Sequence, residues 1–141
     1  MTFHSVANTA YEHEYLEVRG LRFHVTFAGQ REGEPVMLLH GFPEFWYGWR
    51  HQIPALAEAG FRVIIPDQRG YNLSGKPPRV ADYRAEVLAD DIVGLLDVLG
   101  YKSISLVGHD WGGAIAWQVA GRFAERIDRL AILNCPHPAV M

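Results

Sequence analysis

The sequence predicts an α/β protein whose sheet is mostly parallel and opens with an antiparallel hairpin. Short, continuously apolar runs alternate along the chain with segments of helical periodicity, which is typical of a sheet covered by helices on both faces. Before the first of these runs, two β-prone segments, residues 14–19 and 22–28, are separated by Gly20, as in a hairpin. No internal repeat, low-complexity tract or linker divides the 141 residues, so we expect no internal domain boundary.

The remaining elements follow from the apolar runs and from the residues that end them. The expected parallel strands are residues 36–39, 62–66, 103–107 and 129–134, and the expected helices between them are residues 49–59, 83–99 and 113–123. The helix over residues 83–99 has the clearest signal, because its apolar side chains repeat at helical spacing and Gly100 follows it. Asp91 is the one polar residue on the apolar face of that helix. Residues 68–82 are rich in glycine and proline and are expected to form a long loop.

Composition and charge restrict the classes of partner and compartment. The chain has 13 Lys and Arg against 16 Asp and Glu, a net charge of −3, and its basic residues form no run. This balance predicts neither nucleic acid nor an anionic membrane as a partner. The only cysteine, Cys135, cannot form an internal disulfide, and the N-terminus does not resemble a signal peptide. No apolar stretch approaches the ~20 residues that cross a bilayer, so we expect a cytoplasmic protein.

Six residues between the strand 103–107 and the helix 113–123 have the pattern of a nucleophile turn. They read Gly108-His109-Asp110-Trp111-Gly112-Gly113, with a glycine two positions before Asp110 and another two positions after it. Such a turn is strained, and its flanking positions must lack bulk so that strand and helix can approach. The start of the helix also favours negative charge. The pattern predicts Asp110 as the catalytic nucleophile, and a simpler reading makes Asp110 only the N-cap of the helix.

A second loop favours the nucleophile over the simple cap. His40-Gly41-Phe42-Pro43 follows the buried strand 36–39, where an oxyanion hole takes its second donor in folds that carry this turn. We therefore predict that the backbone N–H groups of Phe42 and Trp111 form the oxyanion hole.

The identity of the nucleophile narrows the reaction. An aspartate with a pKa of about 3.9 is ionised at neutral pH and needs no base to attack. Its attack on an ester carbonyl would give an unstable anhydride, whereas its attack on an electrophilic sp3 carbon gives an alkyl ester that water can cleave. Epoxides and alkyl halides carry such carbons. No cofactor is implied, and a metal site of His109, Asp110 and His137 lacks the paired spacing of metal ligands.

Four blocks of sequence resemble the epoxide hydrolases of the α/β-hydrolase fold, across nearly the whole chain. They are residues 40–52, Asp67-Gln68-Arg69-Gly70-Tyr71 with Ser74, residues 108–113 and residues 134–138. Haloalkane dehalogenases are similar and share the His-Asp-Trp-Gly of the turn, but many carry Asn at the position of Phe42 as a halide donor. The resemblance therefore implies an epoxide hydrolase, with a dehalogenase as the alternative.

Five polar residues inside these blocks are more simply explained by structural roles than by catalysis. We expect Asp67, Arg69 and Ser74 to hold their loop in place, and His40 and His109 to act structurally. None of the five is predicted to be the catalytic base.

In this family the chain continues into a helical cap that supplies a tyrosine pair, and then into further core that supplies an acidic residue and the base histidine. The resemblance therefore implies that residues 1–141 are the N-terminal part of a single α/β-hydrolase domain, truncated before the cap and impaired by itself. The expected substrate is a small apolar electrophile, an epoxide. The alternative from another class is a non-catalytic fragment that binds ligands, self-associates or pairs with a complementing chain through an exposed sheet edge.

Overall fold

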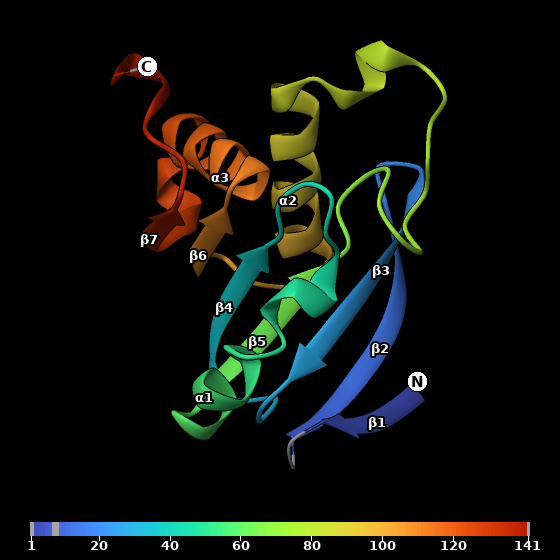
Figure 1. The fold of residues 1–141 in the computed structure, drawn as a ribbon, viewed down its shortest axis with the longest axis vertical. Helices are drawn as coiled ribbons and strands as arrows, with labels where there is room; N and C mark the ends of the chain where they lie inside the picture. The colour runs from blue at the N-terminus through green and yellow to red at the C-terminus, as the bar shows by residue number, and fades with distance from the viewer. Residues whose placement is uncertain (1, 7–8, 141) are drawn as a thin grey trace.

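The computed structural model describes residues 2–6 and 9–140, which form a seven-stranded sheet with helices on both faces (Figure 1). The strands are β1 (Thr2–Val6), β2 (Thr9–Val18), β3 (Leu21–Ala28), β4 (Glu34–Leu39), β5 (Phe61–Pro66), β6 (Ile104–His109) and β7 (Ile127–Leu133). The α-helices are α1 (Ile53–Glu58), α2 (Ala85–Leu99) and α3 (Trp111–Arg122). Four short 3-10 turns are η1 (Trp46–Trp49), η2 (Val80–Tyr83), η3 (Ala124–Arg126) and η4 (Pro138–Val140).

The order of the strands confirms a mostly parallel sheet with an antiparallel start. The order is β1-β2-β3-β5-β4-β6-β7. The pairs from β1 to β5 are antiparallel, whereas β5, β4, β6 and β7 run parallel to one another. Because β4 lies between β5 and β6, the loops that follow these three strands lie together at the carboxyl ends of the strands. This is where open α/β sheets place their binding sites.

Side chains of the buried strands alternate between two cores. On β4, Met37 and Leu39 face the core that α2 and α3 cover, and Val36 and Leu38 face the core beside α1. Figure 1 shows α2 and α3 close together and α1 apart from them. Apolar residues on both faces explain why β4 reads as a continuous apolar run.

Two expectations about the elements were wrong. The strand Thr2–Val6 was not predicted, and it pairs antiparallel with β2 through backbone groups that leave no apolar signature. The expected helix 49–59 is divided into η1 (Trp46–Trp49) and α1 (Ile53–Glu58). Pro54 lies in the first turn of α1, where its missing N–H needs no partner, so this helix begins beside the proline. The other expected strands and helices are present with shifted ends.

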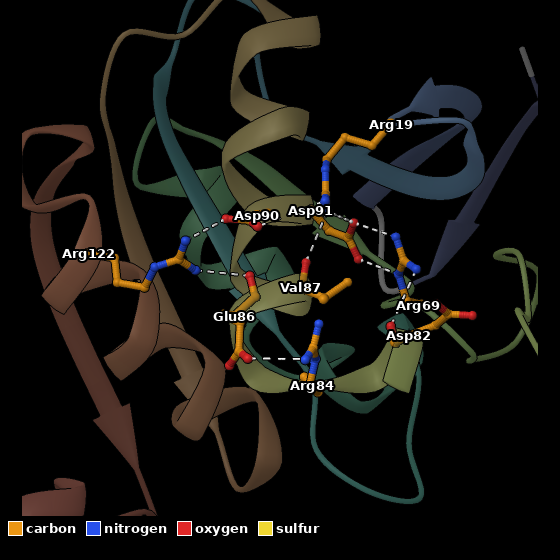
Figure 2. Close-up of polar contacts among 9 residues, drawn as sticks. All are labelled: Arg19, Arg69, Asp82, Arg84, Glu86, Val87, Asp90, Asp91 and Arg122. Carbon is orange, nitrogen blue, oxygen red and sulfur yellow. Dashed lines mark hydrogen bonds and ion pairs between the residues drawn. The ribbon is translucent and has the colours of Figure 1, made fainter. Parts of the chain in front are cut away.

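The polar residue on the apolar face of α2 is buried and fully paired (Figure 2). Asp91 accepts two hydrogen bonds from Arg69, Nε to Oδ2 at 2.8 Å and Nη2 to Oδ1 at 2.9 Å. Arg19 adds a third bond from Nη1 to Oδ1 at 3.0 Å. The hydrogen bonds to Asp91 raise the pKa of Arg69 above its ordinary value. This pair ties the loop after β5 to α2.

We expect Asp91→Ala to lower the free energy of unfolding by about 3 kcal/mol, because it leaves the Arg69 guanidinium buried without its partner. The neighbouring Asp90 is the matched control, since it is half-exposed and pairs with Arg122 at 3.1 Å. Asp90→Ala should cost less than about 1 kcal/mol. Urea denaturation measures the free energy of unfolding of both variants. Equal losses would contradict the prediction that the buried pair of Asp91 and Arg69 contributes more to stability than the exposed pair of Asp90.

Candidate active site

Asp110 lies at a sharp turn between β6 and α3. Its backbone angles, φ 56° and ψ −123°, are the unfavourable ones expected at this position. The turn is closed by hydrogen bonds from the Asp110 N–H to the Leu133 carbonyl at 3.0 Å and from the Gly113 N–H to the Asp110 carbonyl at 2.9 Å. Asp110 stands at the N-cap position of α3, yet its side chain makes no capping hydrogen bond. The Asp110 carboxylate therefore does not act as a helix cap.

Two glycines let the loop after β4 lie directly against this turn. A Cβ on Gly112 would stand 2.3 Å from the Leu39 carbonyl oxygen and 2.5 Å from that of His40. A Cβ on Gly41 would stand 2.7 Å from the Asp110 Cβ. The two carbonyl groups are backbone, and the Asp110 Cβ moves only with its own backbone, so any larger residue at these positions separates the two loops.

The three residues predicted for the site come together at the Asp110 carboxylate. The Phe42 N–H donates to Asp110 Oδ2 at 3.1 Å. The pKa of Asp110 lies below its ordinary value, first because of the Trp111 backbone N–H and then because of the Phe42 N–H. Both donors favour the ionised form, so the exposed carboxylate is negatively charged at neutral pH.

Buried hydrogen bonds of His40 hold the loop after β4 in place. The Gln68 N–H donates to His40 Nε2 at 3.0 Å, so this nitrogen carries no proton, and Nδ1–H donates to the Gly41 carbonyl at 3.0 Å. Burial lowers the pKa of His40 and keeps the ring neutral. On the other side, the Glu44 carboxylate accepts the Gly41 N–H at 3.2 Å and lies 3.5 Å from His109 Nδ1.

Asp67 organises the loop after β5, as expected of a residue that holds this loop. Its buried carboxylate accepts hydrogen bonds from His24 Nδ1 at 2.7 Å, from the Trp46 N–H at 2.9 Å and from Asn72 Nδ2 at 2.8 Å. The Ser74 hydroxyl donates to the Asp67 carbonyl at 2.6 Å. These bonds fix the loop after β5 beside the loop after β4.

An open cleft of about 520 Å³ lies over Asp110. Its walls are largely apolar and include Phe42, Trp111 and Pro136. Two further wall residues, Tyr71 and Cys135, were not predicted as site residues. The signal that would have found Tyr71 is its place four residues after the start of the loop that follows β5, because the carboxyl ends of neighbouring parallel strands meet at one edge.

The described part of the chain has neither a cluster of metal-ligating side chains nor a helix suited to a membrane. Within residues 2–6 and 9–140, no group of three or more His, Cys, Asp or Glu side chains could hold a metal ion. In the same ranges, no helix has the length and apolar character needed to span a membrane.

The chain belongs to the α/β-hydrolase fold family, because the model of that family, described as "alpha/beta hydrolase fold", matches residues 34–141. It is 49% identical over 128 residues to AB hydrolase superfamily protein YfhM of Bacillus subtilis (strain 168), covering 91% of this chain and 45% of that protein. It is 48% identical over 131 residues to Epoxide hydrolase 4 of Mus musculus, covering 91% of this chain and 36% of that protein. The chain thus spans less than half of these relatives.

Solved structures of epoxide hydrolases superpose on most of this chain. Epoxide hydrolase VrEH1 from Vigna radiata superposes with a TM-score of 0.86 at 42% identity, over 89% of this chain and 40% of that chain. Epoxide Hydrolase A from Mycobacterium thermoresistibile superposes with a TM-score of 0.87 at 41% identity, over the same shares. The chain is therefore similar to epoxide hydrolases over most of its own length.

The lowered pKa of Asp110 predicts a titration that depends on the Phe42 contact. In carboxyl-resolved NMR, Asp110 should titrate below the ordinary pKa of an aspartate. Its ionised form therefore adds stability at neutral pH that is lost as pH falls through the folded-state pKa. Gly41→Ala pushes Phe42 away from the carboxylate and should move the pKa of Asp110 upward.

Gly121→Ala is the matched control, since a Cβ at Gly121 meets nothing within 4 Å. An Asp110 titration that is the same in the Gly41 and Gly121 variants would contradict the contact.

Proposed function

We propose that Asp110 is the nucleophile of an epoxide-hydrolase reaction and forms an alkyl-enzyme ester. The observation that carries this proposal is the hydrogen bond from the Phe42 N–H to the Asp110 carboxylate itself. When the nucleophile is a carboxylate, the oxygen that becomes negative during ester cleavage belongs to the aspartate and not to the substrate. The donors of an oxyanion hole must then bind the aspartate oxygen. The backbone N–H groups of Phe42 and Trp111 both donate to the Asp110 carboxylate.

The reaction has two steps. In the first, an Asp110 oxygen attacks a ring carbon, the carbon–oxygen bond of the epoxide breaks, and the released oxygen takes up a proton to become a hydroxyl. In the second, water adds to the Asp110 ester carbon, the charge on the aspartate oxygen is held by the Phe42 and Trp111 N–H groups, and the diol leaves. The resemblance places the base for the second step and the tyrosine pair for the first later in the family's sequence.

The chain by itself is proposed as the N-terminal part of a single α/β-hydrolase domain that attacks an epoxide but does not turn over. Its substrate is a small apolar epoxide, as the apolar walls of the cleft favour. Dehalogenation is the alternative reaction, because Trp111 is exposed in the cleft, where an indole N–H can hold a halide. Phe42 offers no second side-chain donor for a halide, which favours the epoxide. The lone Cys135 favours a cytoplasmic location.

The proposal predicts a single, stable alkylation of Asp110. Incubation with styrene oxide should add the whole mass of the epoxide once, because the ring oxygen stays in the product, and peptide mapping should place the adduct on Asp110. Asp110→Asn should abolish the adduct, and the control Asp128→Asn, at an exposed position of β7, should keep it. Adduct on another residue, or steady turnover to diol by the 141-residue chain, would overturn this assignment.

We further propose that a complementing segment covers one face of the sheet. In the described part of the chain, α1 is the only α-helix on the face to which Val107 of β6 and Leu133 of β7 belong. Leu133 is 44% exposed, and a groove of about 630 Å³ separates α1 from these strands. Parallel sheets are stable with both faces covered, and β7 is an open edge strand. The occupant that fits is a parallel strand and an apolar helix from the rest of a hydrolase core, on this or another polypeptide.

Without that occupant, copies of the chain should associate through the same face. Sedimentation should show association that rises with concentration, and an apolar dye should bind. Leu133→Lys should weaken both effects several-fold, because it places a charge in the contact. The control Val98→Lys alters a 51% exposed residue of α2 and should change neither. A monomer at all concentrations that binds no dye would contradict the proposal.

A further inference from the structure

Tyr71 stands in the wall of the cleft that contains Asp110. It comes from the loop after β5, and its half-buried ring packs edge-on against His40, with ring centroids 4.7 Å apart and an interplanar angle of 71°. His40 in turn holds the loop that presents the Phe42 N–H. The phenol is thus built into the same group of loops as the nucleophile.

The position of Tyr71 is fixed from both sides of its loop. Its N–H donates to the Gln68 carbonyl at 2.9 Å, and its carbonyl accepts the Ser74 N–H at 3.0 Å. Gln68 Nε2 donates to the His40 carbonyl at 2.7 Å, and Arg69 is held on α2 by Asp91 (Figure 2). A side chain held in this way loses little further freedom when it meets a ligand.

The hydroxyl of Tyr71 has its donor capacity unused. Among the described residues, no group forms a hydrogen bond with this hydroxyl. Burial, and then the negative charge of Asp110, raise the pKa of Tyr71 above its ordinary value. The phenol therefore keeps its proton at neutral pH and can donate it to an oxygen in the cleft.

We propose that Tyr71 is a catalytic residue that donates to the ring oxygen of the epoxide while Asp110 attacks the ring carbon, an inference that rests on the proposed function. As the carbon–oxygen bond breaks, its electron pair goes to the oxygen, which takes the phenolic proton. The Tyr71 phenolate then regains a proton from water. This donor comes from the core sheet and is distinct from the tyrosine pair that the resemblance places in the cap.

A pair of electrophiles separates this role from a merely structural one. Styrene oxide releases an oxygen that needs a proton, whereas benzyl bromide releases bromide, which needs none. Tyr71→Phe removes only the hydroxyl and keeps the ring against His40. It should slow alkylation of Asp110 by styrene oxide about tenfold and leave alkylation by benzyl bromide unchanged. The control Tyr47→Phe removes a hydroxyl from a residue outside the cleft wall and should change neither rate.

The rates are followed by intact mass, with peptide mapping to Asp110. Equal slowing with both electrophiles, or no slowing with either, overturns the role of Tyr71 while the alkylated wild-type chain still supports Asp110. A wild-type chain that styrene oxide does not alkylate at Asp110 overturns the proposed function, and the role of Tyr71 with it. The two failures are therefore distinguishable.

Discussion

The site depends on one close approach, that of the backbone after β4 to the first turn of α3. Gly112 lies against the carbonyl oxygens of Leu39 and His40 with no room for a Cβ. This contact places the Phe42 N–H on the Asp110 carboxylate. This contact is possible only because β4 and β6 are parallel neighbours whose carboxyl ends lie side by side. The order of the strands is therefore required for the proposed role of Asp110.

The buried ion pair of Arg69 and Asp91 extends this arrangement to the helix layer. Charges taken out of water gain little net stability, because their desolvation offsets their attraction. The pair instead has a defined geometry, two hydrogen bonds on one carboxylate, and therefore specifies where the loop after β5 lies on α2. A purely apolar contact could slide, whereas this one fixes the direction of the chain that leads to Tyr71.

The two steps of the proposed reaction have different requirements. An ionised carboxylate attacks without a base, so the proposed first step needs a proton donor for the epoxide oxygen but no base. Cleavage of the ester needs an activated water, and the resemblance assigns its base to a later part of the family's sequence. Among the described residues, the groove between α1 and strands β6 and β7 is where the proposed complementing segment would pack.

The sequence alone predicted the fold class and the meeting of Asp110 with Phe42 and Trp111. Both follow from short-range constraints: apolar runs that must be buried, and glycines that must flank a strained turn. Strand β1, the pairing of Asp91 with Arg69 and the place of Tyr71 in the cleft emerged only in the tertiary structure. These features join residues on different elements, and which of them meet is decided by strand order and register, about which the local pattern of each segment carries no information.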